Sequence, residues 1–394
     1  MPDQETSYFS KVLRDIQRLR RTIHQWPDLS GAEQATANRL QDFLIPFRPD
    51  QVHQNWGGQG LAVVFSGSEP GPCTVFTSEL DAVPISDKGS ADYCSQVAGS
   101  GHMCGHDGHM ATLAGLGAIL GQWPPVRGRV VLLFRPQEET GRGAPAVVKD
   151  PRMAKLKPDL VFGFHNMPGY PLGTLLYRPE QFAWAATDYV LELFGRASHG
   201  GQPDKGLSPA MALAQLIQLF ENLSDWSGLD SNQNISQTGY AQLGEADHGT
   251  SPGYARLRAT LRSQINNGLE TLCSKMNQTV AKAAQEHDLK YKAWTENWIP
   301  ATYNHDRALK FLLASAQEID LPILELKKPQ QWSDDFGVLT HYYQGVFFGI
   351  GSGEDCSHLH TSVFDYPEEI LEPALRLYWS ITKKLHWGES PIPL

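Results

Sequence analysis

Ten consecutive residues, from Ser100 to His109, constrain this chain more than any other stretch, because they contain three histidines, a cysteine and an aspartate. Histidine is only moderately buried in proteins, and adjacent titratable groups are costly to remove from water together, so packing does not explain the run. Imidazole and thiolate are preferred ligands of zinc-like divalent metals. Cys104 and His106 can converge on one ion if Gly105 between them turns the backbone sharply. The run therefore predicts part of a metal site.

Composition indicates a soluble globular chain. At 394 residues it is longer than one hydrophobic core usually grows, so about two domains are expected. Apolar residues make up 41% and charged residues 19%, as in ordinary globular proteins. The net charge of -10 argues against a general nucleic-acid surface, which needs a basic footprint. No apolar run reaches the roughly 18 residues of a membrane span.

Cysteine usage predicts a reducing compartment. The five cysteines are widely spaced and odd in number, which does not suit a disulfide framework. The first residues, Met1 to Glu5, are polar and acidic and lack the charged-then-apolar order of a signal peptide. We therefore expect a cytoplasmic protein.

Short apolar runs of strand length alternate with helical patterns. They lie at 73–80, 130–134, 160–164 and 346–350. Because they look buried on both faces, they predict an α/β domain with a mostly parallel central sheet flanked by helices. Ligands bind such sheets at the carboxyl ends of the strands. Asp81, the Glu138–Glu139 pair and His165 all occur at such ends, which predicts an active site there.

Two helices are expected before the first strand. The first is indicated by Val12, Ile16 and Leu19, which recur at helical spacing. The second is expected to begin after Ser30, whose hydroxyl can cap it while Glu33 reciprocates, as in a capping box.

From about residue 186 the pattern becomes that of a small α+β domain. The expected elements follow the order β-α-β-β-α-β: strand 189–194, a helix after Ser208, strands 236–243 and 254–262, helix 269–286 and strand 289–294. The α/β pattern then resumes. We therefore predict a catalytic domain formed by residues 1–185 and 299–394, with a smaller domain, 186–298, inserted into it.

Five metal-ligand candidates lie at predicted strand ends or in polar or glycine-rich loops: Cys104, His106, Glu139, His165 and His360. A single histidine near a loop is more often a surface or hydrogen-bonded residue, so the joint placement is what favours a site. Together these groups could serve two ions that acidify a bridging water. Adjacent glutamates on an extended segment point to opposite sides, so one could ligate while the other acts as general base. A solvated acidic pair is the plainer alternative.

The candidates fall into longer motifs: Leu80-Asp81-Ala82-Val83-Pro84-Ile85, His102-Met103-Cys104-Gly105-His106-Asp107-Gly108-His109, Glu138-Glu139, His165-Asn166-Met167-Pro168, Ser333-Asp334-Asp335-Phe336 and Leu359-His360-Thr361-Ser362-Val363-Phe364. With these motifs the whole chain resembles the metal-dependent amidohydrolases of peptidase family M20. The nearest branch contains aminoacylases, hippurate hydrolases and auxin-conjugate (IAA-amino-acid) hydrolases. The Cys-Gly-His-Asp run with the paired glutamates is highly specific for that branch.

The resemblance implies roles for these residues. The ligands of two divalent ions are then Cys104, His106, Glu139, His165 and His360. The ions would be Zn²⁺ or Mn²⁺, and Ni²⁺ or Co²⁺ would also suit the ligands. Glu138 would be the base that moves the proton, and Asp81, Asp107 and His109 would support the ligands. His199 and Arg262 would bind substrate.

The implied reaction is hydrolysis of the amide bond of an N-acyl amino acid, such as an N-acetyl or N-benzoyl one. The implied partner is that small molecule, with no nucleic acid and no membrane. The smaller domain is expected to act as a lid and to form a homodimer or higher homo-oligomer. Two alternatives stay open: a metallo-carboxypeptidase or dipeptidase of the same family, and a metal-dependent amino-acid binder without turnover.

The chain departs from the family pattern at three places. Glu79 stands where an aspartate is usual, and Ser362 replaces the usual proline two residues after the last ligand. The loop from His248 to Pro252 replaces an Asn-x-Ile-Pro loop of the smaller domain. These departures bear on support of the ligands and on substrate class.

Overall fold

The computed structural model describes residues 2–224, 233–246 and 248–388, which form two compact units. The larger unit comprises Met1–Phe182, Thr302–Lys328 and Asp334–Leu394, and the smaller one comprises Ala183–Ala301 and Pro329–Ser333. The segment Pro329–Ser333 joins the smaller unit because the Trp184 backbone N–H donates to carbonyl oxygens of that segment. Within the described residues, no helix combines the length and apolarity needed to cross a bilayer.

An eight-stranded mixed sheet forms the centre of the larger unit. In spatial order its strands are β1 (Gln51–Trp56), β2 (Gly60–Ser66), β4 (Arg127–Arg135), β3 (Glu69–Glu79), β5 (Leu160–Met167), β16 (Gly345–Gly351), β6 (Leu175–Tyr177) and β15 (Ile323–Glu325). The middle strands β4, β3, β5 and β16 run parallel to one another. The predicted α/β fold with a mostly parallel sheet is therefore confirmed. A separate pair is formed by β7 (Glu180–Ala183) and β14 (Thr302–Asn304).

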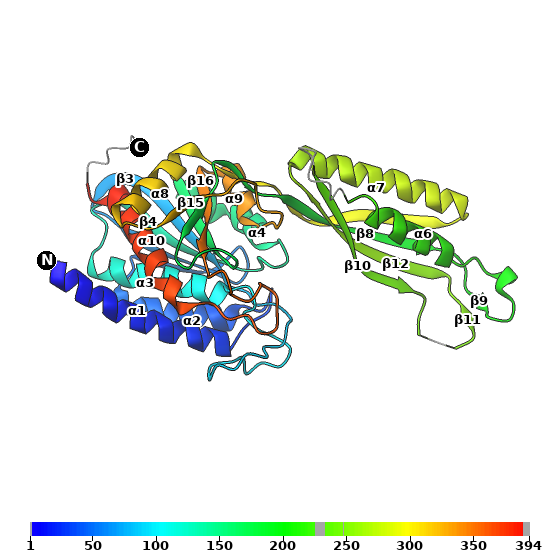
Figure 1. Cartoon of the computed structure of the whole chain (residues 1–394), viewed down its shortest axis with the longest axis horizontal. Coiled ribbons are helices and arrows are strands. Elements are labelled where there is room, and N and C mark those ends of the chain that lie inside the picture. The colour runs from blue at the N-terminus through cyan, green and yellow to red at the C-terminus, as the bar shows by residue number, and fades with distance from the viewer. Residues whose placement is uncertain (1, 225–232, 247, 389–394) are drawn as a thin grey trace. The chain divides into compact units, whose positions relative to one another are not determined.

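Helices cover both faces of this sheet (Figure 1). They are α1 (Pro2–Gln25), α2 (Gln34–Leu44), α3 (His106–Gln122), α4 (Gly143–Lys149), α5 (Pro151–Leu156), α8 (Asp306–Glu318), α9 (Phe336–Tyr342) and α10 (Leu371–His386). On one face α10 places Tyr378 against Phe76 of β3 and Phe348 of β16. On the other face α9 stacks Phe336 on Phe347, the residue before Phe348. Adjacent strand residues point to opposite faces, so the sheet is sandwiched between helical layers.

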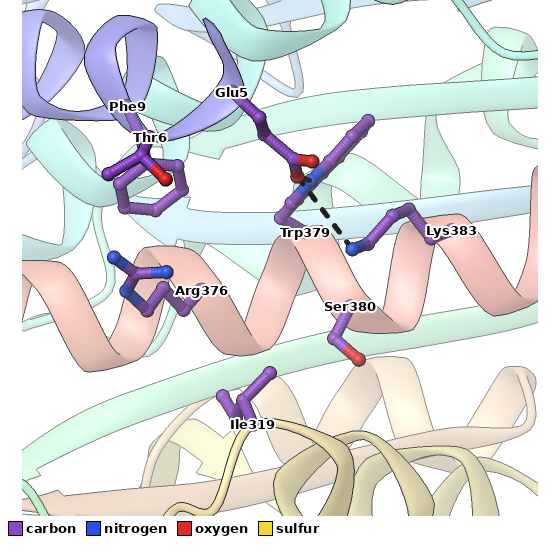
Figure 2. Close-up of a pocket in the computed structure, with 8 residues that line it drawn as sticks. All are labelled: Glu5, Thr6, Phe9, Ile319, Arg376, Trp379, Ser380 and Lys383. Carbon is purple, nitrogen blue, oxygen red and sulfur yellow. Dashed lines mark hydrogen bonds and ion pairs between the residues drawn. The ribbon is translucent and has the colours of Figure 1, made fainter. Parts of the chain in front are cut away.

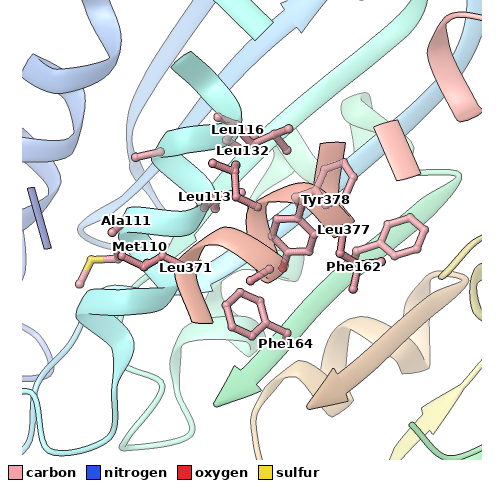
Figure 3. Close-up of a cluster of buried hydrophobic side chains, with 14 of the residues drawn as sticks. Met110, Ala111, Leu113, Leu116, Leu132, Phe162, Phe164, Leu371, Leu377 and Tyr378 are labelled. Atoms are coloured by element: carbon pink, nitrogen blue, oxygen red, sulfur yellow. The ribbon is translucent and has the colours of Figure 1, made fainter. Parts of the chain in front are cut away.

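The core of the larger unit is built around α3. Nearly every residue of this helix is buried, and its apolar side chains lie all round it, which is typical of a helix enclosed by other elements. Figure 3 shows Met110 of α3 near Leu371 of α10, and Leu113 of α3 facing Tyr378 of α10, which lies near Phe162 and Phe164 of β5. The histidine-rich run leads directly into this helix, so the core holds that part of the run in place.

The smaller unit is an antiparallel sheet with helices on one face. In spatial order the strands are β10 (Asn234–Leu243), β12 (Tyr254–Ser263), β8 (Ala185–Phe194) and β13 (Lys290–Ile299), and the helices are α6 (Ala210–Glu221) and α7 (Asn266–Glu286). A separate two-stranded antiparallel sheet is formed by β9 (Ser198–His199) and β11 (Thr250–Ser251) at one end of this unit. The β-α-β-β-α-β order is as predicted. Leu257 and Leu261 of β12 are buried beneath the helices, whereas Arg262 and the other arginines alternate with them on the opposite face.

The predicted capping box at Ser30 is wrong. Helix α2 begins at Gln34, and the Ser30 hydroxyl instead donates to Asp81 Oδ2 at 2.6 Å. Asp28 Oδ2 accepts from both the backbone N–H and the hydroxyl of Thr36, and so satisfies the first turn of the helix. The Ser30 hydroxyl donates to a buried carboxylate, a charge-assisted hydrogen bond that is stronger than the neutral bond a capping hydroxyl accepts from a backbone N–H.

Two glycines of α3 differ in how closely neighbouring side chains pack against them. A Cβ atom at Gly108 would lie 2.4 Å from the Tyr366 ring, whereas one at Gly115 would lie 3.1 Å from the flexible Ile16 side chain. We predict that Gly108→Ala lowers the free energy of unfolding by about 1–3 kcal/mol through overpacking. Gly115→Ala should change it by less than about 1 kcal/mol, because better helix propensity offsets the tight contact. Urea unfolding measures both, and equal effects would contradict the prediction.

Candidate active site

Cys104 and His106 are brought together at the start of α3. Gly105 has φ +96°, a backbone conformation open to glycine, and a Cβ there would lie 2.3 Å from Asn166 Oδ1. The expected sharp turn is therefore present. His106 does not lie in a loop, as expected for the ligand candidates, because it is the first residue of α3.

Hydrogen bonds fix the tautomers of two imidazoles. His106 Nδ1 lies 2.8 Å from the Asp81 carbonyl oxygen, and His165 Nδ1 lies 2.8 Å from the Asn166 carbonyl oxygen. A carbonyl oxygen only accepts, so each Nδ1 carries the proton and each Nε2 presents a lone pair. His165 Nε2 faces Cys104 Sγ at 3.4 Å, and His106 Nε2 is buried without a hydrogen-bond partner.

The two glutamates after β4 face the same point. Glu138 Oε2 and Glu139 Oε1 each lie 3.8 Å from His106 Nε2. The expectation that they point to opposite sides of an extended segment is therefore wrong. The chain turns here because Gln137 has φ +54°, and its backbone N–H is held by Glu33 Oε1 at 2.8 Å.

Asp81 holds this turn in place. Its Oδ1 accepts from the Glu138 backbone N–H at 3.1 Å, and its Oδ2 accepts from that of Glu139 at 2.9 Å. Burial, together with the negative charge of Glu139, raises the pKa of the Asp81 carboxyl to about 6. The Asp81 carboxylate thus orients both glutamates, and the Asp81 backbone carbonyl orients His106.

All five predicted ligand residues lie together. The ligand-type atoms of Cys104, His106 and His165 fall within 4.8 Å of one another, as do those of Cys104, Glu139 and His360. The two groups share the Cys104 thiol. His360 reaches the cluster from a left-handed backbone conformation, φ +61°, and its Nε2 lies 3.4 Å from Glu139 Oε1. Two neighbouring three-residue groups are therefore present.

The cluster has the properties of a divalent-metal site. His106 Nε2 is buried without a hydrogen-bond partner and lies 3.8 Å from Glu139 Oε1, a costly arrangement unless a cation lies between them. Burial and the charges of Glu139 and Glu138 raise the pKa of the Cys104 thiol, so its thiolate form needs a nearby cation. Although burial opposes it, hydrogen bonding to His360 lowers the pKa of Glu139 to about 2. The donor set therefore fits metal ions.

Asp107 and His109 lie behind the cluster. Asp107 Oδ2 binds the Arg20 guanidinium at 2.7 Å and His24 Nδ1 at 2.8 Å. His109 Nδ1 meets Glu79 at 2.8 Å and His109 Nε2 meets the Asn166 side-chain oxygen at 2.8 Å. Both ring nitrogens of His109 are thus engaged, so this histidine offers no lone pair to an ion.

The two predicted substrate-binding residues lie in the smaller unit. Arg262 is near one end of β12, where its Nη1 donates to Ser333 Oγ at 2.9 Å. His199 is exposed in the two-stranded β9–β11 sheet beyond the other end of β12 (Figure 1). Eight residues of strand span about 26 Å, so the structure does not bring these two side chains together.

Sequence reasoning missed a buried charge cluster at the same sheet edge. Arg135, the last residue of β4, ion-pairs with Glu79, Asp334 and Asp335. Burial raises the pKa of the Asp334 carboxyl to about 6. The only signal in the sequence was an arginine directly after the apolar run 130–134. The Asp334-Asp335 pair matched a family motif, but no role had been assigned to it.

A separate pocket of about 230 Å³ lies between α1 and α10 (Figure 2). Phe9 and Trp379 line it together with charged residues, and Glu5 accepts from the Trp379 indole N–H at 2.9 Å. Glu5 is about 28 Å along α1 from His24, at 1.5 Å per residue. The pocket lacks histidine and cysteine, so it offers none of the chemistry of the cluster.

Comparison with known proteins agrees with this site. A family model described as peptidase family M20/M25/M40 matches residues 75–384. N-acetyldiaminopimelate deacetylase of Leuconostoc mesenteroides is 26% identical over 91% of this chain and 94% of its own length. Hippurate hydrolase of Campylobacter jejuni is 26% identical over 94% and 96%. The YXEP protein of Bacillus subtilis, a dinuclear metal-binding peptidase of family M20, has a TM-score of 0.77 at 20% identity, covering 95% of this chain and 98% of that one.

The chain belongs to peptidase family M20/M25/M40. It is an enzyme, a hydrolase of the amidohydrolase and metallopeptidase kind that acts on amide bonds. The predicted family and enzyme class are confirmed.

The turn that carries both glutamates should depend on Asp81. We predict that Asp81→Asn lowers the free energy of unfolding of the metal-free protein by about 1–3 kcal/mol, because the amide NH₂ then faces a buried backbone N–H. Ser30→Ala removes one hydrogen bond to Asp81 and leaves both backbone contacts, so it should cost about 0.5–1.5 kcal/mol. Urea unfolding at neutral pH measures both. A loss from Ser30→Ala that equals or exceeds the loss from Asp81→Asn would contradict this account.

Proposed function

We propose that the protein is a two-metal amidohydrolase that removes the acyl group from N-acyl amino acids. The observation that carries the proposal is the convergence of Cys104, His106, Glu139, His165 and His360 beside the Glu138 carboxylate. The activities named for relatives, a deacetylase of N-acetyldiaminopimelate and a hydrolase of hippurate, favour N-acyl amino acids over other amides.

Two ions would be held by the two ligand groups that share Cys104. Cys104, His106 and His165 would hold one, and Cys104, Glu139 and His360 the other. When bound, such ions polarise an amide carbonyl and lower the pKa of a water molecule toward neutrality. The thiolate favours zinc, and the carboxylate also accepts manganese, nickel or cobalt.

Glu138 would move the proton. The Asp335 backbone N–H donates to its Oε1 at 3.4 Å, while Oε2 faces His106 Nε2. One oxygen is thus held in place and the other is directed to the metal ligands. From there the carboxylate can take a proton from the attacking water and deliver it to the leaving amine. Asp81 would keep Glu138 in this orientation through the backbone contacts at 138 and 139.

Substrate contacts would come from the smaller unit, which we propose acts as a lid and dimerisation domain over residues 186–298. The guanidinium of Arg262 suits a substrate carboxylate. The part of β12 between Arg262 and Tyr254 spans about 26 Å, and His199 lies beyond its Tyr254 end. One small substrate therefore cannot touch both side chains in the same copy. His199 would therefore serve the site of a second copy, where its imidazole can donate to the oxygen on which charge develops.

The function is tested with a substrate panel. We predict that the metal-replete protein hydrolyses N-acetyl or N-benzoyl amino acids, and that chelation abolishes turnover. Glu138→Gln keeps the shape but removes the base, so kcat should fall by about 10²–10⁴-fold while bound metal is unchanged. Product release measures turnover, and elemental analysis measures the metal.

Glu69→Gln, at the opposite end of β3, is the matched control and should behave as the wild type. Hydrolysis of dipeptides alone would favour the peptidase alternative. Binding without hydrolysis across the panel, or full turnover by Glu138→Gln, would contradict the proposal.

The role of His199 predicts complementation between inactive variants. His199→Ala and Glu138→Gln should each be nearly inactive alone, since each lacks one part of the site. Co-expressed as mixed dimers, they regenerate one intact site per mixed dimer, or roughly a quarter of wild-type activity for random C₂ assembly. Activity no greater than the sum of the two parents, or a monomer by light scattering, would exclude a contribution across copies.

A further inference from the structure

Arg135 lies at the centre of the buried charge cluster beside the candidate active site. Its side chain has no exposed surface, and Nε donates to Thr77 Oγ1 at 2.9 Å. One terminal nitrogen binds Glu79 Oε1, and the other ion-pairs with Asp335. Three directions of the guanidinium plane are therefore used at once, an arrangement that a single ammonium group cannot reproduce.

One arm of this network leads to Glu138. Asp335 binds Arg135 through Oδ1, and its Oδ2 accepts from the Ala144 backbone N–H at 2.6 Å, at the start of α4. The Asp335 backbone N–H in turn donates to Glu138 Oε1. Arg135 therefore helps to fix the position of Asp335. Among the described contacts, the Asp335 N–H is the one backbone donor to the Glu138 carboxylate, so its position depends on Arg135 as well.

The other arm leads to His165. Glu79 binds Arg135 with Oε1 and His109 Nδ1 with Oε2. His109 Nε2 contacts the side chain of Asn166, whose backbone carbonyl fixes the tautomer of His165. Because a glutamate stands at position 79, its carboxylate spans Arg135 and His109 at once. This links the departure from the family pattern at Glu79 to Arg135.

We propose that Arg135 is a positioning residue that holds the Glu138 carboxylate and the His165 imidazole in their relative places through Asp335 on one side and Glu79 on the other. The inference rests on the proposed function, in which Glu138 moves the proton. Arg135 contacts neither substrate nor the ligand atoms, so its effect should fall on the chemical step and not on substrate affinity.

Arg135→Lys separates charge from geometry. The lysine keeps the positive charge but not the planar fork, so the melting temperature should stay close to that of the wild type. We expect kcat to fall about 10–100-fold, as for other groups that orient metal ligands, with KM within about threefold and both metals retained. A kcat within twofold of wild type, a rise in KM at constant kcat, or loss of metal would each overturn the proposal.

The charge pairing is tested without any activity measurement. Arg135→Met leaves buried carboxylates uncompensated and should lower the melting temperature of the metal-free protein. Adding Glu79→Gln removes one of those charges, so the double variant should melt higher than Arg135→Met alone. A double variant that melts at or below Arg135→Met would overturn the proposed pairing.

Arg152→Lys is the matched control. Arg152 also pairs with an aspartate, Asp150, and binds backbone carbonyl oxygens, but it lies partly exposed at α5. Its kcat and melting temperature should match the wild type. If the wild type hydrolysed nothing on the substrate panel, the proposed function would fail. The pairing of Arg135 with Glu79 would then be tested only by the melting temperatures of Arg135→Met and the double variant.

Discussion

Buried negative charge is the constraint on which the rest of this structure depends. Six carboxylates gather at one edge of the central sheet: Glu79, Asp81, Glu138, Glu139, Asp334 and Asp335. Removing ionised carboxylates from water is costly unless cations or hydrogen bonds compensate them. Arg135 compensates part of the set, and backbone N–H groups hold Asp81. The remaining charge, together with the buried Cys104 thiol, is what a pair of divalent ions would balance.

The fold supplies the edge at which this charge collects. Parallel strands have their carboxyl ends at the same edge of the sheet. Three site residues meet at this edge: Asp81 after β3, Glu138 after β4 and His165 near the end of β5. More than eighty residues separate Asp81 from His165 in the sequence. Helix α3, enclosed by the core, brings His106 to the same edge. The chemistry is therefore assembled by sheet topology, while hydrogen bonds to Asp81 and Asn166 set the orientation of each group.

Residue type and strand position were enough to predict the fold class and the five clustered ligand candidates, since apolar runs and polar strand ends are local signals. The shared direction of Glu138 and Glu139 was not predictable in this way. It depends on the left-handed backbone of Gln137, which is held by Glu33 from a hundred residues earlier. The diversion of Ser30 to Asp81 and the two arms of the Arg135 network likewise depend on contacts between distant segments, which propensity and spacing do not encode.

One of the three departures from the family pattern, the loop from His248 to Pro252, lies in the smaller unit, and the other two, Glu79 and Ser362, lie in the larger one. The metal-ligand candidates and Glu138 lie in the larger unit, whereas Arg262 and His199 lie in the smaller one. The divergent loop contains Thr250, which pairs directly with His199 in the antiparallel β9–β11 sheet. A change in that loop therefore alters the backbone that presents His199 without disturbing any ligand.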